Sequence, residues 1–214
     1  MKTDFARRQM VEQQIRAWEV SDRRVLEVLS ELPREDFVPP GYGALAFAET
    51  SIPLPHGQRM LTPTVEGRLL QSLRLSPTDE VFEVGTGSGF LTACLARLSG
   101  AVTSVDIFGD FIEAADTRLR SLDIANTALM EMDAMQALPH GSFDAIAIGG
   151  SMPAFDSRFF EILKPGGRLF VVIGSGPIMD AQLIVRGDRP IVTSLFETRV
   201  PPLCNAPAPP VFTF

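Results

Sequence analysis

The sequence predicts an α/β fold built on a mostly parallel sheet, and two patterns carry this prediction. From about residue 80 onward, short apolar segments typical of strands alternate with segments of helical periodicity, as in βαβ units. Two further strand-like segments near the C-terminus have no helix between them, which predicts an antiparallel pair at one end of the sheet. The 214 residues, 45% of them hydrophobic, are enough for one well-buried core.

The N-terminal part is predicted to be helical. Over residues 4–19 the apolar residues Met10, Val11, Ile15 and Trp18 fall on one helical face. Ser21 is a candidate N-cap for a second helix, whose buried stripe would consist of Val25, Val28, Leu29 and Leu32. After an irregular segment rich in proline and glycine, Thr62 and Pro63 are typical of a helix start, and this third helix is expected to run to about residue 73.

The α/β part then contains seven predicted strands and three helices. The strands read "EVFEVG", "AVTSVDI", "TALMEM", "FDAIAIGG", "RLFVVIG", "AQLIVRG" and "IVTSLFETRV", and the helices read "SGFLTACLARL", "DFIEAADTRLRSL" and "SRFFEIL". We expect one domain over residues 1–214. Residues 1–61 would form N-terminal helices and a loop, residues 62–203 the α/β core, and residues 204–214 a proline-rich tail.

Composition excludes several classes of function. The net charge of −7 argues against a nucleic-acid-binding protein, which would show a basic patch. The N-terminal "MKTDFARRQMVEQQ" is charged where a signal peptide needs an apolar core, and no apolar run is long enough to span a membrane, so we expect a cytoplasmic location. Cys94 and Cys204 lie far apart, and no spacing of ligands predicts a metal site.

The segment "VFEVGTGSGF" is the strongest functional motif. Its three glycines stand between a strand and a helix, where they let the backbone turn sharply and approach a ligand. Asp106 ends the next strand 21 residues after Gly85, the spacing at which an acidic side chain meets ribose hydroxyls. A dinucleotide fingerprint would need glycine at position 90, which is Phe90, and a P-loop would need a Lys-Ser/Thr pair. With dinucleotides and P-loop nucleotides excluded, the motif predicts a cofactor that contains adenosine but no pyrophosphate.

This motif, with acidic residues after the second and third strands, resembles the S-adenosylmethionine-dependent methyltransferases of the doubly wound, Rossmann-like type. The resemblance implies that the loop of Gly85, Thr86, Gly87, Ser88 and Gly89 approaches the amino-acid part of S-adenosylmethionine. It also implies that Asp106 holds the ribose and that Asp133 with Ala134 lies beside the adenine, and Glu83 and Ile107 complete the predicted cofactor-binding set. Other interpretations stay open: Asp106 and Asp133 as backbone caps, and Glu83 as a surface charge at a strand end.

The segments "MVEQQIRAWEVSDRRVLEVLSELPREDFVP" and "ALAFAETSIPLPHGQ" resemble the protein-L-isoaspartate O-methyltransferase family. The segments "FEVGTGSGF", "FDAIAIGG", "LKPGGRL" and "RVPPL" fall in that family's order, so the resemblance extends to about Leu203. It implies methylation of isoaspartyl carboxylates in damaged proteins or peptides, with S-adenosylmethionine as methyl donor. A carboxylate is already ionised at neutral pH, so this reaction needs no strong general base.

The chain departs from the family pattern in "GQRMLTP". Leu61 stands where the family places its active-site serine, and Arg59 stands where it places threonine. Thr62 offers the nearest hydroxyl, and Arg59 offers a guanidinium that can pair with an acidic substrate, so these two are the candidate catalytic residues. Thr62 as a helix cap and Arg59 as a solvated loop residue are the structural alternatives. Two functional alternatives also stay open: a methyltransferase with another acceptor, and a cofactor-binding interaction protein without catalysis.

Overall fold

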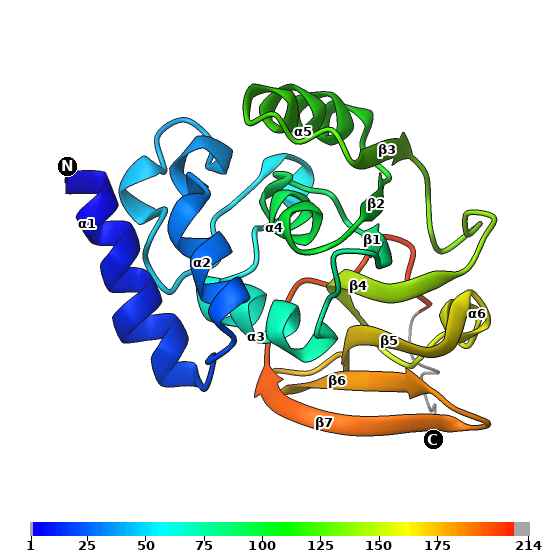
Figure 1. The fold of residues 1–214 in the computed structure, drawn as a ribbon. Helices are drawn as coiled ribbons and strands as arrows, with labels where there is room; N and C mark the ends of the chain where they lie inside the picture. The colour runs from blue at the N-terminus through cyan, green and yellow to red at the C-terminus, as the bar shows by residue number, and fades with distance from the viewer. Residues whose placement is uncertain (1, 208–214) are drawn as a thin grey trace, which may run out of the picture.

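A seven-stranded sheet forms the centre of the molecule (Figure 1). The computed structural model describes residues 2–207, and its strand order is β3-β2-β1-β4-β5-β6-β7. The strands are β1 (Glu80–Val84), β2 (Ala101–Asp106), β3 (Thr127–Glu131), β4 (Phe143–Met152), β5 (Leu163–Ile173), β6 (Met179–Arg186) and β7 (Pro190–Thr198). β1 to β5 pair in parallel, whereas β6 and β7 run antiparallel to their neighbours. The predicted fold class, including the antiparallel C-terminal strands, is confirmed.

Helices cover both faces of this sheet, but unequally (Figure 1). One face carries α3 (Pro63–Leu73), α4 (Phe90–Leu98) and α5 (Gly109–Ser121), with α1 (Lys2–Gln9) and α2 (Arg23–Glu31) packed outside them. Within residues 2–207, the other face carries a single helix, α6 (Arg158–Glu161), and connecting segments. Successive side chains of β1 point to opposite faces of the sheet, as in any β-strand. Val81 packs in the cluster with the N-terminal helices, and Phe82 packs in the cluster around Phe159 of α6.

The N-terminal helices differ in detail from the sequence-based prediction. After α1 the chain continues as a π-helical turn, Met10–Ile15, and a short 3-10 turn, Arg16–Trp18. Met10, Val11 and Ile15 are buried as expected, but Trp18 is 47% exposed, so its predicted place on the buried face is wrong. The widened turn changes the angular position of every later side chain, which explains why a constant helical period misplaces Trp18. The N-cap of α2 is Asp22, not Ser21, and its carboxylate accepts from the backbone N–H of Arg24 at 2.9 Å.

The segment "LKPGGRL" belongs to β5, which begins at Leu163, whereas the sequence predicts this strand only from Arg168 onward. The predicted helix over residues 157–163 is reduced to the four residues of α6. Phe143 of β4 pairs with Leu163, and Ala145 already pairs with Arg168, so the intervening residues 164–167 form an irregular excursion in the ladder. The apolar residues Phe159 and Leu163 are fully buried on either side of this change, which explains why the sequence shows helical periodicity there.

A buried ion pair joins the N-terminal part to the α/β part. Arg34 is fully buried and bonds to the carboxylate of Glu66 in α3. Its other N–H groups donate to the backbone carbonyls of Ala46 and Leu61, each at 2.9 Å, and its guanidinium lies 4.7 Å from the ring centre of Phe90. Burial raises the pKa of the Glu66 carboxyl, and the charge of Arg34 opposes that rise. Arg34 thereby fixes the backbone of the loop that precedes α3.

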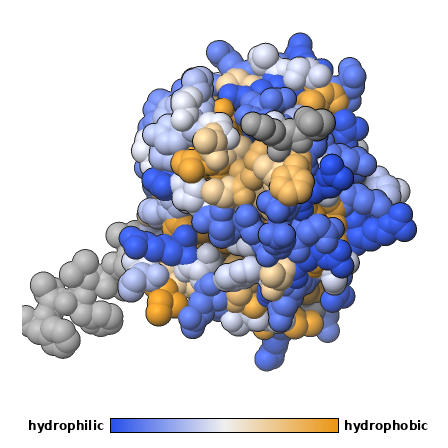
Figure 2. Space-filling model, turned by 90° about the vertical axis from the view of Figure 1, so that its left-hand side faces the viewer, coloured by the Kyte–Doolittle hydropathy of each residue, from blue (hydrophilic) through white to orange (hydrophobic). Residues whose placement is uncertain are grey.

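The surface over the N-terminal helices is mostly hydrophilic, with apolar side chains gathered in one area of this face (Figure 2). Phe5 and Trp18 of the N-terminal part are among the exposed large apolar side chains. No helix within residues 2–207 has both the length and the apolar character needed to cross a bilayer.

Candidate active site at the carboxyl ends of the parallel strands

A pocket of about 670 Å³, its open mouth included, lies at the carboxyl ends of β1, β2 and β4. The chain moves from β1 outward to β2 and β3, and β4 then returns to the other side of β1. Such a reversal leaves a crevice where ligands of doubly wound folds bind. Both Gly149 and Gly150 of β4 line this crevice. A Cβ on Gly149 would lie 3.1 Å from the carbonyl oxygen of Val84, so a glycine lets β4 pass close to the end of β1.

The glycine loop after β1 makes a sharp turn between strand and helix, as the sequence predicts, and its three glycines have a left-handed backbone. Gly85, Gly87 and Gly89 have φ values of 93°, 50° and 84°. Gly85 and Gly87 line the pocket, whereas Gly89 is the N-cap residue of α4 and lies behind it. A Cβ on Gly89 would come within 2.8 Å of the Cβ of Ala115 in α5. The third glycine therefore serves the packing of α4 against α5, and the first two bring bare backbone to the pocket.

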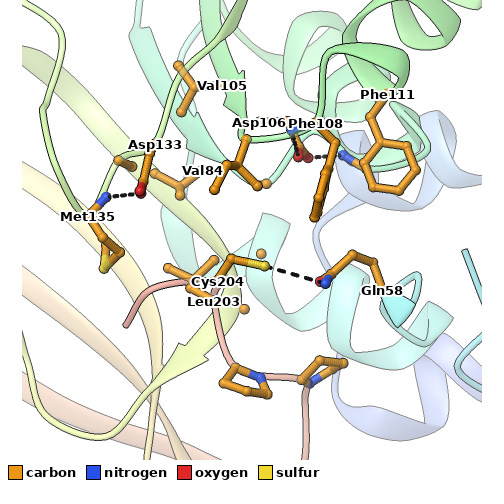
Figure 3. A pocket seen from close by; sticks show the side chains of 18 of the residues that line it. Gln58, Val84, Val105, Asp106, Phe108, Phe111, Asp133, Met135, Leu203 and Cys204 are labelled. Atoms are coloured by element: carbon orange, nitrogen blue, oxygen red, sulfur yellow. Dashed lines mark hydrogen bonds between the residues drawn. The ribbon is translucent and has the colours of Figure 1, made fainter. Parts of the chain in front are cut away.

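Asp106, at the end of β2, presents a largely buried carboxylate to the pocket (Figure 3). Its two oxygens accept from the backbone N–H groups of Gly87 at 2.8 Å and Phe108 at 3.1 Å. Burial raises the pKa of Asp106 above its ordinary value, and these backbone donors oppose the rise because they favour the charged form. Each oxygen keeps a free lone pair, so the carboxylate can accept from two hydroxyl groups of a ligand.

The wall beside Asp106 is apolar with one further carboxylate. Phe108, Phe111, Met132, Ala134 and Met135 supply the apolar surface, and Asp133 supplies the carboxylate. In Figure 3 the ring of Phe108 and the side chain of Asp133 reach the pocket from different strand ends. Oδ1 of Asp133 accepts from the backbone N–H of Met135 at 2.9 Å. This wall suits a flat ring system that carries a hydrogen-bond donor at its edge.

The opposite wall comes from the loop before α3 and from the C-terminal segment. Leu54, Gln58 and Arg59 line it from the loop, and residues 201–204 line it from the C-terminal segment. Ser51 holds the Arg59 guanidinium with two bonds, because the Arg59 Nε donates to Ser51 Oγ at 3.1 Å and the Arg59 Nη2 donates to the Ser51 carbonyl. Nη1 of Arg59 has no hydrogen-bond acceptor or acidic partner within residues 2–207. Arg59 is thus a pocket-lining residue whose guanidinium keeps one nitrogen free of partners within residues 2–207.

His56 connects the loop to α5. Its ring stacks on Phe108 with a centroid distance of 4.1 Å and an interplanar angle of 6°. Nε2 of His56 lies 2.9 Å from a carboxylate oxygen of Asp110. The bond to His56 lowers the pKa of Asp110. His56 therefore fastens the loop to the pocket wall that contains Phe108.

Comparisons with known proteins assign the chain to a family. The sequence profile of protein-L-isoaspartate(D-aspartate) O-methyltransferase (PCMT) matches residues 6–202. The chain belongs to the protein-L-isoaspartate O-methyltransferase family. A protein-L-isoaspartate O-methyltransferase of Koribacter versatilis is 32% identical over 206 residues, which cover 94% of this chain and 92% of the relative. One of Brucella anthropi is 35% identical over 171 residues, which cover 79% of this chain and 78% of the relative.

Solved structures of the same family show the same fold. A putative protein-L-isoaspartate O-methyltransferase of Plasmodium falciparum, in complex with S-adenosyl-L-homocysteine, matches with a TM-score of 0.78 at 20% identity. The match covers 92% of this chain and 97% of that one. Another protein-L-isoaspartate O-methyltransferase structure matches with a TM-score of 0.81 at 21% identity, over 94% of this chain and 66% of that one. The family consists of S-adenosylmethionine-dependent O-methyltransferases, so the enzyme class predicted from the sequence is confirmed.

In this methyltransferase fold, not all predicted cofactor residues face the pocket. Gly85, Gly87, Asp106, Ile107, Asp133 and Ala134 line it. Thr86 and Ser88 do not: the Thr86 hydroxyl bonds to Ser104 Oγ at 2.6 Å, and Ser88 Oγ accepts from the backbone N–H of Phe90 at 3.4 Å. Glu83 is fully buried under α4, where one oxygen accepts from Thr92 at 2.5 Å and from Ser104 at 2.6 Å. Glu83 is thus neither a surface charge nor part of the pocket wall.

The two candidate catalytic residues are placed differently. Arg59 lines the pocket, whereas Thr62 does not, because its hydroxyl lies 3.3 Å from the Thr64 hydroxyl at the start of α3. Thr62 occupies the N-cap position and Pro63 begins the helix, as predicted, but the Thr62 side chain makes no capping bond. Glu49 takes that role by accepting from the backbone N–H of Thr64 at 3.2 Å. Leu61, at the family's serine position, is buried and does not line the pocket either.

Several pocket residues were missed by the sequence analysis. Gly149 and Gly150 had a signal, because a glycine pair at the carboxyl end of a strand beside the reversal of strand order is expected near a ligand. Phe108 and Phe111 had none, since aromatic residues at the start of a helix are usual in cores. The contribution of residues 201–204 depends on the path of the chain after β7, which local sequence does not reveal. No group of acidic, histidine and cysteine side chains within residues 2–207 has the arrangement of a metal site.

Proposed function

We propose that this protein transfers the methyl group of S-adenosylmethionine to the side-chain carboxylate of isoaspartyl residues in proteins or peptides. The observation that carries the proposal is one continuous pocket with two chemically different walls. The strand-end wall offers bare backbone at Gly85 and Gly87 and the carboxylate of Asp106. The opposite wall offers the guanidinium of Arg59, which matches an anionic acceptor.

The strand-end wall fits an adenosine cofactor. Asp106 would accept hydrogen bonds from the two ribose hydroxyls, since each of its oxygens keeps a lone pair after bonding to backbone N–H groups. Asp133 would accept from the exocyclic amine of adenine, and Ala134 and Ile107 would contact the ring system. The glycine loop would pass next to the amino-acid part of the cofactor, where any side chain would obstruct it.

The chemistry asks little of the protein beyond positioning. When bound, S-adenosylmethionine supplies an electrophilic methyl group on a sulfonium sulfur. The acceptor carboxylate is ionised at neutral pH, because its pKa is about 4. The chain's own residues would therefore orient the carboxylate and exclude water and would not need to remove a proton. The lack of a histidine among the pocket-lining residues agrees with this requirement.

Arg59 would hold the acceptor in place of the hydroxyl that other family members use. Its Nε and Nη2 are engaged by Ser51, which fixes the plane of the guanidinium and leaves Nη1 for the acceptor. Thr62 would contribute only indirectly, through the start of α3, because its hydroxyl bonds to Thr64. A guanidinium contributes charge as well as a hydrogen bond, so acceptors with an additional acidic group near the isoaspartyl carboxylate should be preferred.

The direct test uses purified protein, methyl-labelled S-adenosylmethionine and a pair of peptides that differ only in isoaspartyl or aspartyl linkage at one position. Base-labile label on the isoaspartyl peptide alone is the expected result. Binding of S-adenosylhomocysteine without transfer to either peptide would refute isoaspartyl specificity and favour a different acceptor. Lack of S-adenosylhomocysteine binding would refute the assignment of the pocket.

A further inference from the structure

The C-terminal segment of residues 201–205 is held against the end of β4, and its residues 201–204 line the pocket. The backbone N–H of Ser151, near the end of β4, donates to the carbonyl of Pro201 at 2.8 Å, and the N–H of Leu203 donates to the carbonyl of Ser151 at 2.9 Å. Leu203 packs directly on Gly150, where a Cβ would lie 2.8 Å from Cδ2 of Leu203. These contacts hold the segment at a defined height over the end of the sheet.

Two consecutive side chains of this segment reach the two opposite walls. Sγ of Cys204 lies 3.5 Å from Nε2 of Gln58, on the wall that contains Arg59 (Figure 3). Nδ2 of Asn205 donates to Oδ2 of Asp133 at 2.8 Å, on the opposite wall. The C-terminal segment thus connects the acceptor side of the pocket with the side proposed for the adenine.

The contact with Asn205 determines how Asp133 is presented. Oδ1 of Asp133 is already bonded to the backbone N–H of Met135, and Asn205 bonds to the second oxygen, so both ends of the carboxylate are fixed. A carboxylate oxygen has room for a further donor, so these bonds orient Asp133 without exhausting it as an acceptor. Asn205 has a φ of 60°, a left-handed conformation that asparagine adopts more readily than most residues, which suits this residue type to the position.

We propose that Asn205 is a positioning residue for adenine recognition, because it holds the carboxylate of Asp133 in the orientation that accepts the exocyclic amine of the base. The inference rests on the proposed binding of S-adenosylmethionine in this pocket. An oriented acceptor favours adenine over a base that carries a carbonyl oxygen at the same place, since two acceptors facing each other repel. Asn205 therefore contributes to selectivity for the base and not only to the shape of the pocket.

The test compares two ligands by titration calorimetry: S-adenosylhomocysteine and S-inosylhomocysteine, in which the amine is replaced by a carbonyl oxygen. For Asn205→Ala we expect affinity for S-adenosylhomocysteine to fall about threefold to tenfold, the range for loss of one hydrogen bond, with a smaller change for S-inosylhomocysteine. The ratio of the two affinities should fall accordingly. In an Asp133→Ala background, Asn205→Ala should have no further effect, because the carboxylate that it orients is gone.

One control variant helps to separate the possible results. Pro207→Ala alters the same segment beyond Asn205 and should leave both affinities unchanged. An equal loss of affinity for both ligands in Asn205→Ala would show a general loosening of the segment and would overturn the proposal, as would an unchanged affinity for S-adenosylhomocysteine. Failure of the unsubstituted protein to bind S-adenosylhomocysteine would overturn the proposed function itself and this inference with it.

Discussion

The free energy of unfolding is expected to fall as the pH rises, because of Glu83, and Glu83→Gln should remove most of this fall. Glu83 is fully buried, and only one of its carboxylate oxygens has hydrogen-bond donors, the hydroxyls of Thr92 and Ser104. The other oxygen, Oε1, has no hydrogen-bond partner among the described residues 2–207. Burial without a cation beside it raises the pKa of Glu83 from 4.5 to about 8, so the folded protein holds this proton at neutral pH. Glutamine has nearly the same shape and keeps an oxygen for the two hydroxyl donors.

The magnitude follows from the pKa difference between the folded and unfolded chains. Between pH 4.5 and about 8 the unfolded chain releases this proton while the folded chain keeps it, so folding becomes less favourable as pH rises through that window. Each pKa unit corresponds to about 1.4 kcal/mol, so the carboxyl of Glu83 lowers the free energy of unfolding by up to about 5 kcal/mol above pH 8. The loss is absent below pH 4.5, where both states are protonated.

The measurement is guanidinium-induced unfolding of the original protein and of Glu83→Gln, at about pH 5 and about pH 8.5. The difference in unfolding free energy, variant minus original protein, should be larger at pH 8.5 than at pH 5 by about 2–5 kcal/mol. Its affinity for S-adenosylhomocysteine should not change, because Glu83 does not line the pocket. A difference in unfolding free energy that is the same at both pH values would refute the reasoning. A large loss of affinity for S-adenosylhomocysteine would instead mean that Glu83 contributes to cofactor binding.

Three further substitutions test the site and its support. Asp106→Asn should weaken S-adenosylhomocysteine binding by about 1–3 kcal/mol, the effect of impairing a buried hydrogen-bonding group, and unchanged affinity in calorimetry would contradict its ribose-binding role. Arg59→Gln should raise the KM for an isoaspartyl peptide and leave S-adenosylhomocysteine affinity unchanged. Arg59→Lys keeps the positive charge and should raise the KM less. An unaltered KM in Arg59→Gln would mean that Arg59 does not bind the acceptor. Glu66→Ala should lower the free energy of unfolding by about 3–5 kcal/mol because it leaves Arg34 buried and unpaired. Denaturation that shows a loss under about 1 kcal/mol would mean that water reaches Arg34.

The sequence was most informative where function depends on backbone conformation at strand ends. The glycines of "GTGSG" and the acidic residue ending β2 follow from local requirements, namely a sharp turn and a carboxylate at the edge of the sheet. The structure brings Gly85, Gly87, Asp106, Ile107, Asp133 and Ala134 together in one pocket. Their predicted contacts with the cofactor stay predictions. Glu83 was harder to place, since a charged residue near the end of a strand usually reaches solvent, and only the packing of α4 over β1 buries it.

In the loop before α3, sequence position alone does not predict which side chains line the pocket. The sequence makes Thr62 and Arg59 equal candidates for a catalytic role, because both lie next to Leu61 in the segment that matches the family's active-site loop. Arg34 bonds to the Leu61 carbonyl from a helix turn far earlier in the chain, and Glu49 caps α3 in place of Thr62. In the folded loop, which these two long-range contacts hold, Arg59 lines the pocket and the side chains of Leu61 and Thr62 do not.

The sequence by itself thus determined the class of fold and the order of its strands and helices, because hydrophobic periodicity and glycine-dependent turns are local properties. The family followed from the resemblance of whole segments to known methyltransferases and not from these patterns. Only the tertiary structure decided which side chains share the pocket. That depends on where β4 returns beside β1 and on where the chain runs after β7. The contact between Asn205 and Asp133 joins residues 72 positions apart. No local pattern encodes such a contact, since it exists only once the sheet has placed both loops at the same edge.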